Sequence, residues 1–318
     1  MESANTVRVY GCGGAGVNIA SGYEKANKDT KDDVEVSYID TSRSNLTTDV
    51  KDNQVFILDN VDGSGKVRAE NHQEIANVTK KILLQFEPAQ MNLVLFSGSG
   101  GSGSVLGPLI VSELLSKGEN VIAMVVGSQE SVITAQNTMN TLKSLESVSK
   151  SKDKPVVMFY QQNDRKRSEV NEVFELGISS IAILSSRKNK ELDSKDISNL
   201  LYFNKTTSVS SQLAYLDIYN DLAQANSVED PIAVASLYKN EDMEHLSTIP
   251  EYSCVGYFPD SVNGIENLHY IINVETIPKI VKQLKTTLDK YENQKASRVQ
   301  QASLLNESDN VTDSGLIL

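Results

Sequence analysis

The segment Ser97-Gly98-Ser99-Gly100-Gly101-Ser102-Gly103-Ser104 contains only glycine and serine over eight consecutive positions. An apolar run at 92–96 precedes it, and a helix-like run at 105–115 follows it. Because glycine loses much conformational freedom on folding, a packed chain tolerates such a segment only where its backbone wraps closely around something. Backbone amides at the start of a helix attract anions. The segment therefore predicts a phosphate-binding loop between a buried strand and a helix.

A second glycine-rich segment, Gly11-Cys12-Gly13-Gly14-Ala15-Gly16-Val17-Asn18, lies between an apolar run at 7–10 and a helical pattern at 17–27. It contains the spacing Gly-x-Gly-x-x-Gly, and Asp40 ends the next apolar run at a distance suited to a ribose-binding acid. Both features are typical of a dinucleotide-binding fold. On this segment alone, an NAD-dependent oxidoreductase is a competing interpretation.

The first half of the chain alternates apolar runs with helical patterns. We expect strands at 7–10, 34–39, 54–58, 92–96, 121–126 and 156–160, and helices at 17–27, 67–85, 105–115 and 131–149. This order predicts an α/β fold with a parallel sheet and helices on both faces. The carboxyl ends of its strands share one edge, so both glycine-rich segments would face one ligand. Two amide-rich loops suit a polyphosphate, whereas a dinucleotide fold needs only the first loop.

The second half predicts a long central helix at 170–184 and a shorter helix at 194–203. Apolar runs at 233–238, 253–258 and 268–274 follow, separated by turns, and indicate a smaller α+β domain. A long last helix at 276–302 becomes polar beyond residue 288, and an acidic tail covers 306–318. We therefore expect three parts: a nucleotide-binding domain with the central helix at 1–187, a second domain at 188–275, and the last helix and tail at 276–318.

The composition excludes several classes of function. A net charge of −12 disfavours nucleic-acid binding, which needs Lys and Arg against phosphates. No apolar run approaches the length of a membrane span, and the first residues do not resemble a secretory signal. Two cysteines and three dispersed histidines offer neither a disulfide framework nor a zinc site. We expect a cytoplasmic protein with no membrane or nucleic-acid partner.

The glycine-rich segments resemble those of a known family. The stretch 99–104 is similar to the phosphate-binding signature of tubulin and FtsZ, which reads small-Gly-Gly-Thr-Gly-small-Gly, and 11–18 is similar to the first nucleotide loop of FtsZ. The chain is identified as a member of the tubulin/FtsZ superfamily. The stretch 101–110 and the acidic tail resemble the phage-encoded tubulins of the PhuZ type. The resemblance implies GTP or GDP with Mg²⁺ as ligands, and a GTPase that polymerises head to tail with itself. It also implies filaments in a host bacterial cytoplasm, with a phage capsid or nucleus-like assembly as a further partner.

The resemblance also assigns site residues. In this family an Asn-x-Asp-(x)2-Asp loop enters the next subunit's pocket. Here that loop matches Glu191-Leu192-Asp193-Ser194-Lys195-Asp196, which makes Asp193 and Asp196 the candidate catalytic residues. Two carboxylates order and polarise a water, but simple capping of the helix that follows is the competing interpretation. No metal ligand is identified.

The nucleotide contacts that the resemblance implies come from several loops, with Asn171 against the guanine edge. They are Gly11, Cys12, Gly13, Gly14, Asn18, Asp40, Thr41, Gly65, Ser99, Gly100, Gly101, Ser102, Gly103, Ser104 and Asn171. The chain departs from FtsZ at Ser42, at Ser102 in place of threonine, at Val105 in place of glycine and at Glu191 in place of asparagine. These departures leave open a polymer that binds nucleotide without turning it over.

Overall fold

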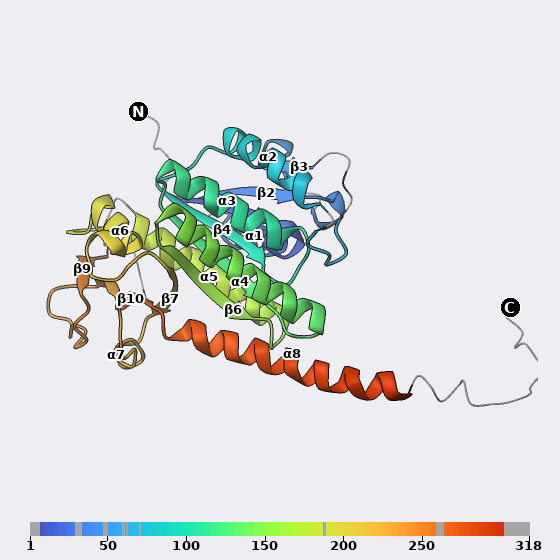
Figure 1. Cartoon of the computed structure of the whole chain (residues 1–318). Coiled ribbons are helices and arrows are strands. Elements are labelled where there is room, and N and C mark those ends of the chain that lie inside the picture. Colours follow the sequence, from blue (N-terminus) through green and yellow to red (C-terminus); the bar gives the residue numbers. More distant parts are fainter. Residues whose placement is uncertain are drawn as a thin grey trace, which may run out of the picture.

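One continuous sheet of ten strands organises the computed structural model, in the order β3-β2-β1-β4-β5-β6-β7-β10-β8-β9 (Figure 1). The structure describes residues 7–28, 34–46, 50–58, 61, 63–69, 71–186, 189–258 and 264–301, with side chains as far as 295. The predicted tail at 306–318 and the predicted domain boundary at 187 lie outside this set. All described strand pairs from β3 to β7 are parallel.

The parallel part contains the six strands predicted from the apolar runs. They are β1 (Val7–Cys12), β2 (Val34–Asp40), β3 (Val55–Ile57), β4 (Met91–Ser97), β5 (Val121–Gly127) and β6 (Val156–Gln162). Strands β1 and β4 are neighbours, and the chain proceeds outward from them in opposite directions. In open α/β sheets, ligands bind at such a switch point, outside the carboxyl ends of the strands. The two glycine-rich segments directly follow these two strands.

Helices cover both faces of the sheet, as predicted. One core cluster contains residues of α1 (Gly13–Ala26), α5 (Arg167–Ser185) and α6 (Ser194–Leu201). The other contains residues of α2 (His72–Gln85), α3 (Gly103–Lys117), α4 (Val132–Lys152) and α8 (Thr276–Gln301). Short 3₁₀ turns at Arg43–Asn45, Asp52–Gln54 and Phe203–Lys205 complete the connections. Among the described residues, no helix is both long and apolar enough to cross a membrane.

The strand that joins the two halves was not predicted. Strand β7 (Leu213–Tyr219) pairs in parallel with β6 and antiparallel with β10 (Asn267–Asn273). Strands β8 (Ala233–Tyr238) and β9 (Tyr252–Tyr257) therefore extend the same sheet, with the short helix α7 (Leu222–Asn226) beside them. The sequence obscures β7 because Asp217 interrupts its apolar pattern. In the fold, that carboxylate accepts a hydrogen bond of 2.8 Å from Asn273 Nδ2 on the partner strand.

The observed starts of several helices differ from the predicted ones. Helix α1 begins at Gly13 and α3 at Gly103, so the glycine-rich segments include the first turns of both helices. Helix α2 begins at His72, five residues later than expected. At this edge of the sheet, each glycine-rich segment therefore comprises both a loop and the first turn of the helix that follows it.

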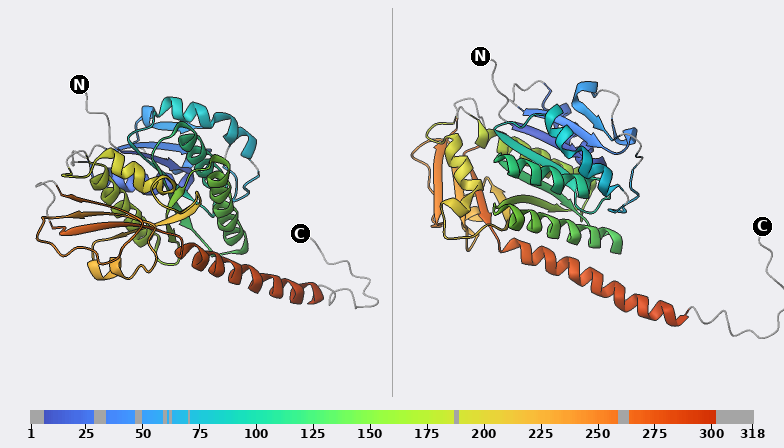
Figure 2. Two further views of the ribbon diagram at one scale, coloured as in Figure 1. Left: turned by 60° about the vertical axis from the view of Figure 1, so that its left-hand side comes forward. Right: turned by 45° about the horizontal axis from the view of Figure 1, so that its top comes forward.

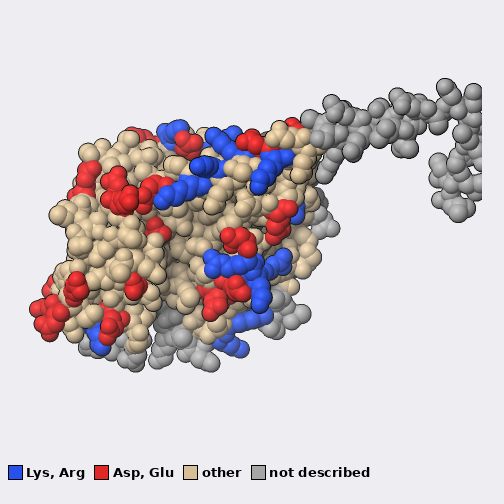
Figure 3. Space-filling model, turned by 90° about the horizontal axis from the view of Figure 1, so that it is seen from below, with Lys and Arg blue, Asp and Glu red and all other residues tan. Residues whose placement is uncertain are grey.

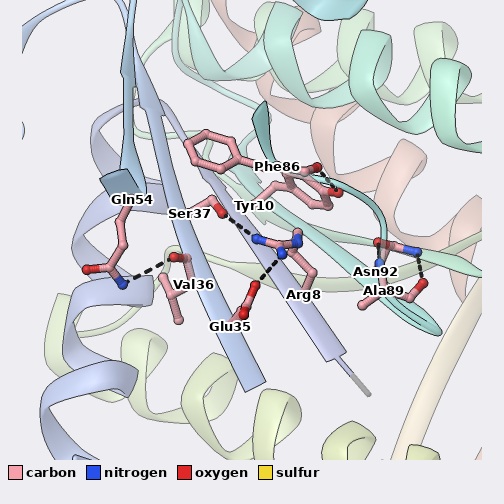
Figure 4. A network of polar contacts seen from close by, with 9 residues as sticks. All are labelled: Arg8, Tyr10, Glu35, Val36, Ser37, Gln54, Phe86, Ala89 and Asn92. Atoms are coloured by element: carbon pink, nitrogen blue, oxygen red, sulfur yellow. Dashed lines mark hydrogen bonds and ion pairs between the residues drawn. The ribbon is translucent and has the colours of Figure 1, made fainter. Parts of the chain in front are cut away.

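Polar contacts at the amino ends of the strands fix the opposite edge of the sheet (Figure 4). Arg8 forms an ion pair with Glu35 on the neighbouring strand and donates a hydrogen bond of 3.1 Å to Ser37 Oγ. Tyr10 donates a hydrogen bond of 3.0 Å from its hydroxyl to the carbonyl of Phe86, at the end of α2. These contacts fix β1 against β2 and against the end of α2. They thereby help to set the position of the glycine-rich loop that follows β1.

Candidate active site

The two glycine-rich loops touch through their backbones. Gly13 has a φ of +67°, and a Cβ atom built on it would lie 2.8 Å from the Cα of Gly103. Conversely, a Cβ on Gly103 would lie 2.8 Å from the carbonyl oxygen of Cys12. Real Cβ atoms essentially never approach backbone this closely. Glycine at both positions is therefore the condition for the two loops to share one site.

A cavity of about 580 Å³ opens above this contact. It is lined by twelve of the residues predicted from the sequence, namely Cys12, Gly13, Gly14, Asn18, Asp40, Thr41, Ser99, Gly100, Gly101, Ser102, Gly103 and Asn171. They come from the carboxyl ends of β1, β2 and β4, from the loops that follow, and from the second turn of α5. Segments far apart in the sequence thus enclose one polar space.

Three of the predicted residues do not line the cavity. Gly11 lies beneath the first loop, where a Cβ would meet the carbonyl oxygen of Gly16 at 2.8 Å. Ser104 is buried, and its hydroxyl donates to the carbonyls of Gly100 at 2.7 Å and Gly101 at 2.8 Å. Gly65 is exposed beside the cavity. Gly11 and Ser104 therefore shape the loops from behind.

Three of the helices that begin at the cavity lack a side-chain cap, whereas a fourth, α4, is capped by Ser131. No side chain caps the first amides of α1, α3 or α5, whose first residues line or adjoin the cavity. By contrast α4, α6 and α7 are capped by Ser131, Asp193 and Asp221. Unsatisfied amides and the positive end of the helix dipole form an anion site. Three such helix ends beside one cavity, two of which contain the glycine-rich segments, suit a ligand with several negative charges.

Three hydroxyl groups meet at the centre of the site. The Ser102 hydroxyl lies 2.6 Å from that of Thr41 and 3.0 Å from that of Ser64. A Cβ on Gly101 would lie 1.9 Å from Ser64 Oγ, so the segment around Ser64 rests directly on the second glycine loop. This hydroxyl junction links three loops, and each hydroxyl is a donor or acceptor suited to a phosphate oxygen.

Asp40 braces the site. Its carboxylate is buried and accepts hydrogen bonds from the backbone amide of Thr41 at 2.7 Å and from Asn45 Nδ2 at 2.8 Å. Burial raises the pKa of Asp40, and these hydrogen bonds oppose part of that rise. Burial also raises the pKa of the Cys12 thiol, which makes it a poor nucleophile.

Sequence reasoning missed several residues of the cavity. The structure adds Asn45, Lys66, Thr134, Asn163 and Arg167 to its lining. Lys66 and Arg167 place positive charge at the cavity, in a chain whose net charge is −12. Arg167 was missed because the predicted central helix began at 170, whereas α5 begins at Arg167, four residues before Asn171 on the same helix face. Thr134 and Asn163 had none, because only the packing of α4 and the end of β6 bring them here.

The candidate catalytic acids lie elsewhere. Asp193, with Glu191, lines a separate hollow together with Ser185 at the end of α5. The other end of α5, at Arg167 and Asn171, lines the nucleotide-type cavity. A helix of 19 residues is roughly 28 Å long at 1.5 Å per residue. The acids and the cavity of one chain are therefore at opposite ends of the central helix.

Both acids serve as caps of α6. Asp193 Oδ1 accepts from the amides of Lys195 at 2.7 Å and Asp196 at 3.0 Å, while Asp196 Oδ2 accepts from the amide of Asp193 at 3.1 Å. Asp196 Oδ1 also lies 3.2 Å from the hydroxyl of Tyr252. The amide hydrogen bonds lower the pKa of the exposed Asp193. Capping is thus a structural role of the pair, and it holds the Asp193 carboxylate at the surface and the Asp196 carboxylate beside it.

The fold and the cavity together define a protein of the tubulin/FtsZ class, with two phosphate-type loops at the switch point of a parallel sheet and a central helix running away from them. Family models agree with this class. The model described as Tubulin/FtsZ family, GTPase domain, matches residues 6–162, and the model described as Phage tubulin-like protein, C-terminal domain, matches residues 192–277.

Full-length relatives narrow the assignment. The chain is 30% identical over 332 residues to a phage tubulin-like protein of Pseudomonas phage phiKZ, covering 100% of this chain and 99% of the relative. It is 31% identical over 316 residues to the phage tubulin-like protein of Pseudomonas phage PhiPA3, covering 98% of each. The chain belongs to the phage tubulin-like proteins of the tubulin/FtsZ family.

Solved structures give the same result. A protofilament of TubZ from bacteriophage PhiKZ matches with a TM-score of 0.86 at 29% identity, covering 98% of this chain and 96% of that one. The phage tubulin PhuZ with GDP matches with a TM-score of 0.87 at 25% identity, covering 98% and 99%. The protein is a GTPase and a filament-forming cytoskeletal protein of the tubulin type. None of these matches supports the alternative of an NAD-dependent oxidoreductase.

Proposed function

We propose that this chain hydrolyses GTP at a site that two copies share, with the nucleotide in the cavity of one copy and Asp193 and Asp196 supplied by the next. The observation that carries the proposal is the separation of the acids from the cavity by the length of α5. Within one copy the carboxylates cannot reach a terminal phosphate. A head-to-tail stack places the α6 end of one copy against the cavity of another.

The proposed chemistry follows from the groups that meet at such a contact. The uncapped starts of α1 and α3 bind the phosphates, and Lys66 and Arg167 offset their charge. Asn171 reads the guanine edge. The Asp193 and Asp196 carboxylates hold a water in line with the terminal phosphate and accept its proton. Phosphoryl transfer is catalysed mainly by such positioning and by stabilisation of charge.

Mg²⁺ fits this site as an ion held chiefly by the nucleotide. Mg²⁺ keeps several waters and usually takes only one or two protein ligands. Among the described residues, no cluster of three or more His, Cys, Asp or Glu side chains forms a dedicated metal cage. The Thr41, Ser64 and Ser102 hydroxyls are the side-chain groups that would hold the water ligands of such an ion. When bound, the ion would neutralise charge on the phosphate oxygens.

Assembly and turnover are coupled in this proposal. A head-to-tail contact joins two different surfaces and does not close on itself, so it propagates a filament. Each contact completes one active site, and loss of the terminal phosphate weakens that contact. We propose that these filaments act in the cytoplasm of a phage-infected bacterium, on a phage capsid or nucleus-like assembly. The division into parts at 1–187, 188–275 and 276–318 remains part of this proposal.

The experiment separates catalysis from capping. Asn is as good an N-cap as Asp, so Asp193→Asn keeps the cap of α6 and removes the negative charge. We expect Asp193→Asn and Asp196→Asn to bind GTP and form filaments while phosphate release falls at least tenfold. Asp221→Asn, at the cap of α7, is the matched control, because Asp221 Oδ1 accepts only a capping bond of 2.8 Å from the Gln224 amide among the described contacts. Normal phosphate release by both α6 variants would refute the catalytic assignment.

A mixing experiment tests whether the site is shared. Gly101→Val places a branched side chain where the Ser64 hydroxyl lies and blocks the cavity, yet leaves Asp193 and Asp196 intact. Asp193→Asn retains the cavity and lacks the acid. A mixture should release phosphate faster than the sum of the two variants alone, because some contacts pair an intact cavity with an intact acid. If labelled Gly101→Val enters the filaments and the rates merely add, the shared site is wrong.

A further inference from the structure

Helix α4 carries a stripe of buried polar side chains. Thr134, Asn137, Thr138 and Thr141 follow one helix face at helical spacing, and each is at most 6% exposed. Threonine and asparagine are poor helix formers and are usually exposed. A buried polar stripe persists only when its groups are hydrogen-bonded. The stripe therefore indicates a helix face built to hold other polar segments.

That face holds the loops of the nucleotide cavity. Asn137 Nδ2 donates to the carbonyls of Lys66 at 2.8 Å and Ser99 at 3.1 Å. Thr141 Oγ1 donates to the carbonyl of Gly98 at 2.8 Å. Through one face, α4 thus fixes the second glycine loop and the segment that contains Ser64.

The same face also clamps the loop between β5 and α4. Thr138 Oγ1 donates to the carbonyl of Ser128 at 3.0 Å and accepts from the Ser128 amide at 3.2 Å. Ser128 and Glu130 line the cavity, and so does Thr134 at the start of α4. The loop at 127–131 is therefore part of the cavity wall and is held by α4.

Helix α8 packs against α4 and belongs to the same core cluster. Its apolar residues follow one face, at Ile277, Ile280, Val281, Leu284 and Leu288. Beyond this stripe α8 projects away from the body of the molecule (Figures 1 and 2). Seen from below, this face of the molecule carries both Lys or Arg and acidic side chains (Figure 3).

One hydrogen bond joins α8 to the cavity wall where the helix leaves the body. Thr287 Oγ1 donates to Gln129 Oε1 at 3.1 Å. Thr287 directly precedes Leu288, the last residue of the apolar stripe, and Gln129 lies between Ser128 and Glu130 of the cavity wall. The projecting part of α8 therefore starts at a contact with the loop at 127–131, whose neighbouring residues Ser128 and Glu130 line the cavity.

We propose that Gln129 and Thr287, with α4 as the rigid support beneath them, couple nucleotide occupancy to the direction of α8. The proposal rests on the guanine nucleotide site proposed above. A nucleotide that contacts Ser128 and Glu130 restricts the loop at 127–131 and so strengthens the Gln129–Thr287 hydrogen bond. Coupling is reciprocal, so fixing α8 also strengthens nucleotide binding. Gln129 and Thr287 are positioning residues, because neither lines the cavity.

The test uses two neighbouring threonines of α8. Thr287→Val removes the hydroxyl at nearly constant volume. Thr286→Val is the matched control, because the described hydrogen bond of Thr286 Oγ1 goes to its own helix, at the carbonyl of Lys282. We expect fluorescent GDP to bind the Thr287→Val monomer roughly two- to tenfold more weakly, which is the effect of losing one neutral hydrogen bond. Thr286→Val should bind it like the wild type.

A distance measurement supplies a readout that a merely structural role would not change. Spin labels at Lys117→Cys and Lys290→Cys, in a Cys254→Ser background, report the direction of α8 relative to α3. In the wild type the distance distribution should narrow when GDP is added, and in Thr287→Val it should stay broad with and without GDP. The proposal is overturned if Thr287→Val matches Thr286→Val in both affinity and distance. A wild-type chain that binds no guanine nucleotide would instead refute the site itself.

Discussion

Substituting Gly13 by alanine tests the claim that backbone contact between the two glycine loops makes the site. The left-handed conformation of Gly13 costs a non-glycine residue roughly 1–2 kcal/mol. In addition, the new Cβ would lie 2.8 Å from the Cα and N of Gly103, which are backbone atoms that cannot rotate away. Overpacking of this kind costs about 1–3 kcal/mol. Together, Gly13→Ala should lower the free energy of unfolding by roughly 2–5 kcal/mol.

The control is Gly118→Ala, which isolates the backbone cost. Gly118 has a φ of +82° at the end of α3, and nothing lies within 4 Å of a Cβ built there. Its variant should lose only the conformational part, about 1–2 kcal/mol, and keep nucleotide binding. Urea unfolding and titration with fluorescent GDP measure both quantities. Equal destabilisation of the two variants, with nucleotide binding intact in Gly13→Ala, would refute the argument.

Three further predictions concern other parts of the molecule. Ser102→Ala removes the central hydroxyl of the junction and should weaken GTP binding by about fivefold to tenfold, because each neutral hydrogen bond contributes about 1 kcal/mol. Competition with fluorescent GDP measures the affinity. Unchanged affinity would show that the junction does not take part in binding. Asp193→Ala, unlike Asp193→Asn, should also lower the midpoint of thermal unfolding, because alanine removes a helix cap worth about 1 kcal/mol. Equal unfolding midpoints for the two variants would show that the cap does not contribute to stability. Burial lowers the pKa of His269 to about 4, so the folded state resists protonation and stability should fall as the pH drops from about 6.5 towards 4, by at most about 3 kcal/mol. The difference between the urea unfolding midpoints of the wild type and His269→Gln should therefore be larger at pH 7.5 than at pH 5. A difference that stays constant with pH would contradict this account.

Much of the parallel sheet and its site could be predicted from local pattern. Buried parallel strands appear as continuous apolar runs, and the glycine-rich segments identify which strand ends carry the ligand. For this reason twelve of the predicted contact residues line one cavity. The roles of Gly11 and Ser104 were less accessible, because a glycine or serine in a loop reads the same whether it faces the ligand or supports the loop from behind.

Other features depended on partners that are distant in the sequence. Strand β7 contains Asp217, whose carboxylate accepts hydrogen bonds from Tyr219 two residues on and from Asn273 on another strand. Asn137 and Thr141 read as ordinary polar helix residues, yet they hold the carbonyls of the second glycine loop. No local pattern signals a hydrogen bond whose acceptor lies dozens of residues away.

The sequence by itself determined the class of sheet, the edge at which a ligand binds and the chemical character of that ligand, because apolar periodicity and glycine content act locally along the chain. Only the tertiary structure decided that the two glycine loops touch, that α5 separates the acids from the cavity, and that α4 joins the loops to α8. These are distances between segments that share no local signal, and they are set by how the sheet and its helices pack.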